Sequence, residues 1–226
     1  MNSQLRGAFY GLTAAAIWGG MYVVSDVVLR TIPPFTLLSI RLIMAALLLG
    51  ILVLRLPNRP ALSRSDMLRL FGVGIVGFGI SVAAQFVGTD KSTAVNGTLV
   101  TSASPAFILI FAAILLREKL TGIRIAAVAL ATIGVIVIID PANASFGSDT
   151  FLGDMALAFA AVTWGLYSVL VRRVSARFDT SIVSFYALIG GLFITIPASI
   201  LELGSKSIGT IDMGTILGIL YIAIIS

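Results

Sequence analysis

The chain has neither cysteine nor histidine among its 226 residues. Their absence excludes disulfide bonds, thiol chemistry, imidazole general bases and the commonest zinc ligands. A phosphate-binding loop of the Gly-Lys-Ser/Thr type is also missing, so direct use of ATP is not expected. We therefore expect no metal, no cofactor and no enzymatic activity, because an intramembrane enzyme needs a compact set of nucleophile, base or metal ligands at depth.

Charged residues are scarce as well. They make up 11% of the chain, against about 25% in soluble domains, while hydrophobic residues make up 58% and the mean hydropathy is +1.09. Such a chain needs a lipid bilayer as its solvent. The net charge of +5 comes from bases that gather in short gaps between apolar segments, as in membrane loops, so no nucleic acid partner is expected.

Seven apolar segments reach the length of about 20 residues that a helix needs to cross a bilayer. They cover residues 8–29, 35–54, 70–88, 94–116, 122–139, 151–171 and 181–201. An eighth apolar segment begins near Gly214 and reaches Ser226 after only about 12 residues, which is too short to cross the bilayer core. We therefore expect the sequence to stop inside a span. The first segment is longer than the apolar region of a signal peptide, so it is predicted to be a permanent span and not a cleaved signal.

Basic residues alternate between the two sides of this stack of helices. Eleven fall on one side, at Arg6, Arg55, Arg59, Arg64, Arg69, Arg117, Lys119, Arg124, Arg172, Arg173 and Arg177. The opposite gaps hold only Arg30, Lys91 and Lys206. Since cytoplasmic loops retain Lys and Arg, we predict a multi-pass protein of the cell inner membrane with a cytoplasmic N-terminus.

An internal repeat is indicated by the two tryptophans. Trp18 and Trp164 each begin a Trp-Gly pair, and aligning residues 14–23 with 160–169 gives five identities. The offset carries the first span onto the sixth, so each repeat has five spans, and an odd number inverts the second copy. The predicted repeats are residues 1–141 and 142–226, the second ending within its third helix. The predicted fold is thus an all-α polytopic membrane protein with two inverted five-helix repeats, ten helices when complete.

Several short motifs occur in an order that resembles one family. They are Trp18-Gly19 in the first span, Arg41 in the second, Pro105 and Glu118 in the fourth, and Trp164-Gly165 in the second copy. Together they resemble the drug/metabolite transporter superfamily, EamA type, and within it the aromatic amino acid exporters. The departures are Arg117, where that family often has glycine, and Ala187, where the equivalent of Arg41 would fall. The resemblance implies a ten-helix inner-membrane carrier that moves amino acids outward.

Aromatic and polar residues recur on one face of the first, third, fourth and sixth spans. Both tryptophans lie roughly 15 to 20 Å deep, too deep for interfacial anchors, which leaves helix packing and cavity lining as equal alternatives. Aromatic faces would hold an apolar group, and hydroxyl and amide groups would hold a zwitterion. The candidate substrate-binding residues are Trp18, Tyr22, Phe78, Ser81, Gln85, Asn96, Thr101, Ser104, Trp164 and Tyr167.

A second set is expected to have structural or gating roles: Gly11, Gly19, Asp26, Arg41, Pro105 and Glu118. The glycines belong to a row of small residues four apart that lets helices approach closely. Asp26 is placed to pair with Arg30, and Arg41 to reach the outer boundary, where it either is structural or meets a substrate carboxylate. Pro105 frees the carbonyl of Thr101, which either binds a substrate ammonium group or is satisfied by a neighbouring hydroxyl or water.

The favoured function is an alternating-access carrier that exports a small amphipathic metabolite, most of all an aromatic or hydrophobic amino acid. Export of another compound by the same fold, such as a nucleobase or a cation, is the alternative, followed by a channel or a non-transporting scaffold. No carboxylate lies at mid-depth in these spans, which weakens proton coupling. The substrate itself, the direction of flux, its energy source and the oligomeric state stay open, and a monomer is compatible with the sequence.

Overall fold

The structure is a computed structural model, and it describes residues 3–56, 62–139 and 147–225. Helices dominate this part of the chain, which contains no strand. The helices are α1 (Ser3–Leu29), α2 (Pro34–Leu54), α3 (Arg64–Gly74), α4 (Val82–Lys91), α5 (Ala94–Thr101), α6 (Ser104–Leu116), α7 (Gly122–Ile139), α8 (Asp149–Ser175), α9 (Thr180–Leu203) and α10 (Met213–Leu220). Two π-helical segments, η1 (Ile75–Ser81) and η2 (Tyr221–Ile225), complete the set.

Within the described residues, seven helical stretches are long and apolar enough to cross a membrane, which confirms the seven predicted spans. They are Phe9–Leu29, Pro34–Leu54, Arg64–Lys91, Ala94–Leu116, Gly122–Ile139, Asp149–Ser175 and Thr180–Leu203. Large aliphatic side chains cover their outer faces, with Ile123 80% and Leu201 78% exposed. An apolar surface of this extent requires a lipid environment, so the chain is a multi-pass membrane protein.

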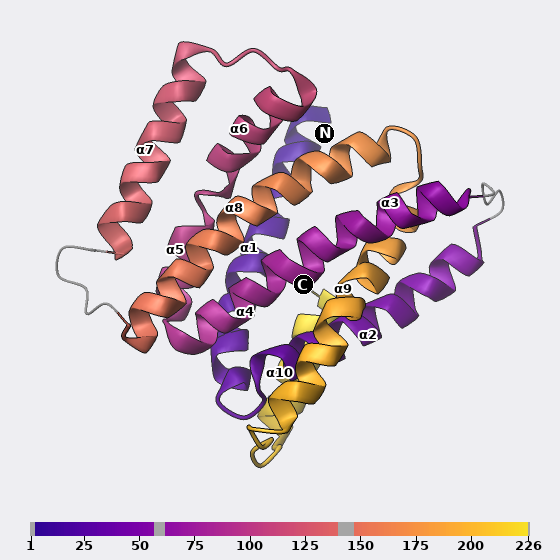
Figure 1. Ribbon diagram of the computed structural model, residues 1–226, viewed down its shortest axis with the longest axis vertical. Helices are drawn as coiled ribbons and strands as arrows, with labels where there is room; N and C mark the ends of the chain where they lie inside the picture. The colour runs from indigo at the N-terminus through magenta and orange to yellow at the C-terminus, as the bar shows by residue number, and fades with distance from the viewer. Residues whose placement is uncertain (1–2, 57–61, 140–146, 226) are drawn as a thin grey trace.

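The third span is longer than the predicted segment 70–88. Ser63 caps the N-terminus of α3 by accepting a hydrogen bond from the backbone N–H of Asp66, so the helix starts in the polar flank. From α3 the span continues through η1 into α4, and Figure 1 shows it running alongside α8 through the middle of the molecule. The third span also packs closely against α9. Glycine makes this approach possible, because a Cβ at Gly74 would lie 2.0 Å from the carbonyl oxygen of Ala187 on α9.

The fourth span, predicted as one helix over 94–116, is broken into α5 and α6 at a turn through Ser102 and Ala103. Pro105 occupies the first turn of α6. Proline cannot donate the helical hydrogen bond and its ring clashes with the preceding turn, so α5 ends and a second helix starts with proline at its N-terminus. The break exposes a stretch of polar side chains at depth inside the span.

The packing of the helices leaves a space between α1, α4, α5, α6 and α8. The main pairings are α2 with α9, α4 with α8 and α6 with α8, and α7 lies at one edge of the bundle without a buried residue. Met21, Phe86 and Leu157, from α1, α4 and α8, are fully buried in one core cluster. This cluster fixes the three helices that face the space.

Candidate functional site

The two tryptophans lie against each other, one on α1 and one on α8. The ring centroids of Trp18 on α1 and Trp164 on α8 are 5.0 Å apart, with the ring planes inclined at 56°. The aromatic chain continues from Trp164 to Tyr167 at 4.8 Å and from Tyr167 to Phe78 at 5.6 Å. Aromatic pairs at these separations attract through both burial and ring electrostatics. The chain of rings therefore connects α1, α8 and η1 across the bundle.

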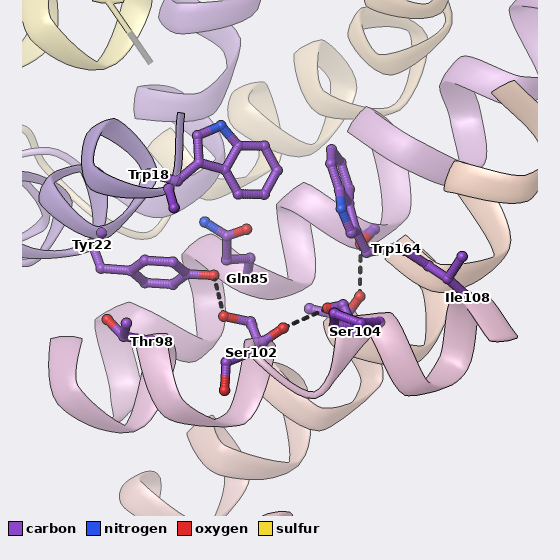
Figure 2. A pocket seen from close by; sticks show the side chains of 14 residues that line it. Trp18, Tyr22, Gln85, Thr98, Ser102, Ser104, Ile108 and Trp164 are labelled. Atoms are coloured by element: carbon purple, nitrogen blue, oxygen red, sulfur yellow. Dashed lines mark hydrogen bonds between the residues drawn. The ribbon is translucent and has the colours of Figure 1, made fainter. Parts of the chain in front are cut away.

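A cavity of about 440 Å³ opens beside the tryptophan pair. Figure 2 shows its wall, on which Trp18 and Tyr22 of α1 face Ser104 and Ile108 of α6. The lining residues are Ala15, Trp18, Gly19, Tyr22, Ser81, Gln85, Thr98, Thr101, Ser102, Ser104, Pro105, Ile108, Ala160 and Trp164. None of these residues carries a formal charge at neutral pH. The cavity has the size, aromatic lining and sparse polar groups of a small-molecule site.

Hydroxyl groups on the wall donate their hydrogens within the protein. The Tyr22 hydroxyl donates to Oγ1 of Thr101 at 2.6 Å, and the Ser81 hydroxyl donates to the carbonyl of Ala160 at 2.8 Å. The Thr98 hydroxyl likewise donates to the carbonyl of Ala94 at 2.8 Å. Each oxygen keeps lone pairs for an incoming N–H group. This part of the cavity suits an ammonium or other hydrogen-bond donor.

The carbonyl of Thr101, freed by Pro105, accepts the hydroxyl hydrogen of Ser104 at 2.6 Å. The sequence left two alternatives for this carbonyl, a substrate ammonium group or a neighbouring hydroxyl or water. In the structure the neighbouring hydroxyl of Ser104 satisfies it. The carbonyl thus needs no ligand in this arrangement. Pro105 and Ser104 both contribute to the cavity wall, so the helix break shapes the cavity directly.

Gln85 on α4 is the one amide side chain on this wall. It is only 8% exposed, and within the described parts of the chain its side-chain amide makes no hydrogen bond. Figure 2 shows it on the side of the cavity that Trp18 and Tyr22 also line. Because Gln85 borders the cavity, its amide is available to a molecule that enters it. Such a group is poised to bind a polar ligand.

Seven of the ten predicted substrate-binding residues line this cavity, and Phe78, Tyr167 and Asn96 do not. Phe78 and Tyr167 lie behind Trp164 in the aromatic chain. Asn96 projects from the opposite part of α5, where its amide donates to the carboxylate of Asp154 at 3.0 Å. Asp154 is itself buried and also accepts the hydroxyl hydrogen of Ser92.

Thr98, Ser102 and Ile108 line the cavity but were not among the predicted residues. With Thr101 and Pro105 they follow helical spacing, and this periodicity is the signal that would have identified them. The polar stripe that the sequence suggested included Asn96, which is rotated away from the cavity. Hydroxyls occur on both faces of α5, so polarity alone does not select the cavity face.

The glycine row of α1 does not pack as expected. A Cβ added at Gly11 or Gly19 would meet no atom of the described chain within 4 Å, and Gly19 instead lines the cavity. Close approach occurs one residue further on, at Gly20, whose Cβ would lie 2.5 Å from the hydroxyl oxygen of Tyr221. That hydroxyl donates to the carbonyl of Ile17 at 3.0 Å. The packing face of α1 is thus rotated from the predicted one.

Two charged residues behave differently from each other. Asp26 pairs with Arg30 at 3.0 Å, as their spacing predicts. The expectation that Arg41 reaches the membrane boundary is wrong, because its side chain is buried at 9% exposure where α2 packs on α9 and α4. Its guanidinium lies 5.8 Å from the centre of the Phe86 ring, a cation–π arrangement.

Glu118 joins three segments at the other end of α6. Its carboxylate lies 2.8 Å from the guanidinium of Arg172 on α8 and 3.7 Å from that of Arg124 on α7. The preceding residue, Arg117, ends α6 with a positive φ of 56°. Glycine adopts that conformation most readily, which explains why the resembling family often has glycine at this position.

Comparison with known proteins places the chain among transporters. The sequence pattern of the EamA-like transporter family matches residues 5–140. A probable amino-acid metabolite efflux pump of Escherichia coli (strain K12) is 29% identical, over 95% of this chain and 72% of that protein. An uncharacterized transporter of Archaeoglobus fulgidus is 25% identical over 92% and 72%, respectively. A solved crystal structure at 24% identity shares the fold with a TM-score of 0.63, over 95% of this chain and 72% of that one.

Proposed function

The chain belongs to the EamA-like transporter family, and we propose that it exports a small amphipathic metabolite, with aromatic and hydrophobic amino acids as the favoured substrates. The observation that carries this proposal is the cavity between Trp18 and Trp164, which joins aromatic surface to uncharged polar groups. The name of the Escherichia coli relative, an amino-acid metabolite efflux pump, supports the substrate class and the direction.

The charge of the cavity favours a substrate with no net charge. Its described lining contains no Asp, Glu, Lys or Arg, so an ion entering it would lose hydration without gaining a counter-ion. A zwitterion has no net charge and presents an ammonium group and a carboxylate side by side. The hydroxyl oxygens of Tyr22, Thr101 and Ser104 would accept from the ammonium group, and the amide N–H groups of Gln85 would donate to the carboxylate.

The aromatic rings would hold the other end of the substrate. Trp18 and Trp164 offer their faces to an aromatic or aliphatic side chain, while Tyr167 and Phe78 support Trp164 from behind. Burial of a large side chain against such rings contributes about 1.5–3 kcal/mol. We assign the first two rings to substrate contact and the second two to positioning.

Alternating access would follow from the two predicted repeats. Trp18 belongs to repeat 1–141 and Trp164 to repeat 142–226, so relative rocking of the repeats would separate the rings and open the cavity to one side. A carrier of this kind binds substrate before each crossing. Flux therefore saturates and is stimulated by substrate on the far side, which a channel does not show.

The test is counterflow in vesicles that contain the purified protein. Vesicles preloaded with unlabelled phenylalanine should accumulate external labelled phenylalanine faster than empty vesicles do, and Trp18→Ala should abolish the difference. Absence of counterflow for every amino acid and nucleobase tried would remove the proposal. Repeating the assay with a proton gradient in either direction determines the energy source.

The inverted arrangement and the orientation can be tested by cysteine labelling, because the chain has no native cysteine. Arg55→Cys and Arg177→Cys lie after the second and sixth spans, and both should react only with reagent on the cytoplasmic side. Lys206→Cys should react only from outside. Labelling of the first two on opposite sides would contradict the repeat.

A further inference from the structure

A second cavity, of about 510 Å³, lies between α3 and the C-terminal end of α8. It shares no lining residue with the cavity beside the tryptophans. Its lining residues are Asp66, Arg69, Gly72, Val73, Leu170, Arg173, Val174, Arg177 and Phe178. Figure 1 shows the two helix ends that form it on the same side of the molecule, near the connection from α8 to α9.

Helical spacing aims the basic residues into this cavity. Leu170 is followed by Arg173 and Val174 at intervals of three and four, so these residues occupy one face of the last turns of α8. Arg177 lies in the turn just after α8 ends at Ser175. Arg69 is presented in the same way by the first turns of α3. Three arginines, from α3, α8 and the turn after α8, therefore line one space.

Two of the three guanidiniums have no acidic partner in the part of the chain that the structure describes. Arg69 lies 3.5 Å from the carboxylate of Asp66, which also accepts the hydroxyl hydrogen of Ser63 at 2.6 Å. Arg173 and Arg177 have no carboxylate within 4.0 Å among the described residues, whereas their neighbour Arg172 is paired with Glu118. Three arginines against one aspartate leave the cavity with a net charge of +2.

The remaining lining is apolar, with Val73, Leu170, Val174 and Phe178 beside the arginines. The cavity lies where the span Arg64–Lys91 begins and the span Asp149–Ser175 ends, which is the depth of lipid headgroups. Arginine binds phosphate through two parallel hydrogen bonds, and basic pockets between membrane helices suit anionic headgroups. A lipid phosphate would meet the guanidiniums while its acyl chains stay against the apolar residues.

We propose that this cavity binds the phosphate group of an anionic phospholipid from the adjoining leaflet. A phosphate held by Arg69 on one side and by Arg173 and Arg177 on the other links α3 to α8. It removes the repulsion between the three guanidiniums and stabilises the observed approach of the two helix ends. Transport by the protein would then depend on the lipid composition of the membrane.

Binding can be measured on the purified protein in detergent, by native mass spectrometry and by the thermal unfolding midpoint. The probes are short-chain phosphatidylglycerol, short-chain phosphatidylcholine and free glycerol phosphate. Phosphatidylglycerol should bind and raise the midpoint, and the other two should bind about tenfold more weakly, since one lacks net charge and the other lacks apolar chains. Glycerol phosphate binding as tightly as phosphatidylglycerol would overturn the lipid assignment in favour of a soluble phosphate.

The variant Arg173→Gln with Arg177→Gln should lose at least about tenfold in affinity for phosphatidylglycerol. Arg55→Gln with Arg64→Gln is the matched control, because it removes the same charge from exposed positions that do not line the cavity. Arg173→Lys with Arg177→Lys keeps the charge and should lose part of the affinity. If the Gln variant and the control lose equal affinity for phosphatidylglycerol, general surface charge explains the binding, and the proposed lipid site is wrong.

Discussion

The indole rings of Trp18 and Trp164 lie in contact, with centroids 5.0 Å apart, although 146 residues separate them in the chain. They are the two tryptophans among these 226 residues, and both line the same cavity. One consequence is chemical, because the pair forms an aromatic wall contributed by two distant helices. Another is practical, because all the tryptophan fluorescence of these 226 residues arises at this cavity.

Substrate binding should therefore change tryptophan fluorescence in the unmodified protein. A bound amino acid displaces water from both indoles, so we expect a blue shift and a saturable change of intensity that gives the dissociation constant. Trp18→Ala and Trp164→Ala should each weaken binding by about tenfold while the protein is produced at a normal level. Phe159→Ala, an exposed aromatic residue on α8, is the control and should leave binding unchanged. Loss of abundance in both tryptophan variants would assign the rings to packing instead.

Gln85→Leu should separate function from stability. The buried amide has no partner among the described residues, so its replacement by an apolar side chain of similar size should leave the thermal unfolding midpoint unchanged or raise it. Substrate transport should fall by at least about tenfold, since the only amide on the cavity wall is lost. Thr132→Val, which removes an exposed hydroxyl on α7, serves as the control for a lost polar group. A lowered midpoint with normal transport would contradict the role in binding.

Glycines on two helices should respond in opposite ways to alanine. At Gly74 a new Cβ would meet the backbone of Ala187 at 2.0 Å, so Gly74→Ala should separate α3 from α9 and lower stability by about 1–3 kcal/mol or more. At Gly11 no described atom lies within 4 Å, and Gly11→Ala should stabilise α1 by up to about 1 kcal/mol. Unfolding in detergent compares the two variants, and equal effects would show that the crossing of α3 and α9 is wrong.

Arg117→Gly should stabilise the protein. Arg117 holds a left-handed φ of 56°, which costs a residue with a Cβ about 1–2 kcal/mol and costs glycine almost nothing. The unfolding midpoint should rise even though a basic side chain is removed. Arg117→Ala removes the same side chain without relieving the backbone and should not raise the midpoint.

The Glu118 ion pairs should show a dependence on salt. Glu118→Gln removes the contacts with Arg172 and Arg124, both of which are partly exposed, so the loss should be about 0.5–1 kcal/mol at low ionic strength. Near 1 M salt the Debye length falls to about 3 Å and the difference from the unmodified protein should largely disappear. A double-mutant cycle with Arg172→Gln isolates the shorter pair, and a coupling energy of zero would contradict it.

Some features could be predicted well from the sequence because they depend only on local properties of the chain, such as the length of an apolar run or the spacing of two residues. Apolar runs and their lengths fixed the seven spans, and the spacing of Asp26 and Arg30 fixed their pairing. The effect of Pro105 on the carbonyl of Thr101 was predictable because a missing N–H acts locally, whereas the complete break between α5 and α6 was not predicted. The seven predicted residues on the cavity wall were found because aromatic and polar groups at this depth are rare.

Other features were decided by the rotation of each helix about its axis, which the apolar residues on all sides of these spans leave unspecified. Arg41 is buried because α2 turns that face toward α9 and α4, and Asn96 is directed to Asp154 because α5 turns it from the cavity. Composition and periodicity thus determined that this protein is a stack of membrane helices with aromatic residues at depth. Only the tertiary packing decided which faces meet and which residues share a cavity, because a lipid-soluble helix can be rotated without changing its own hydropathy.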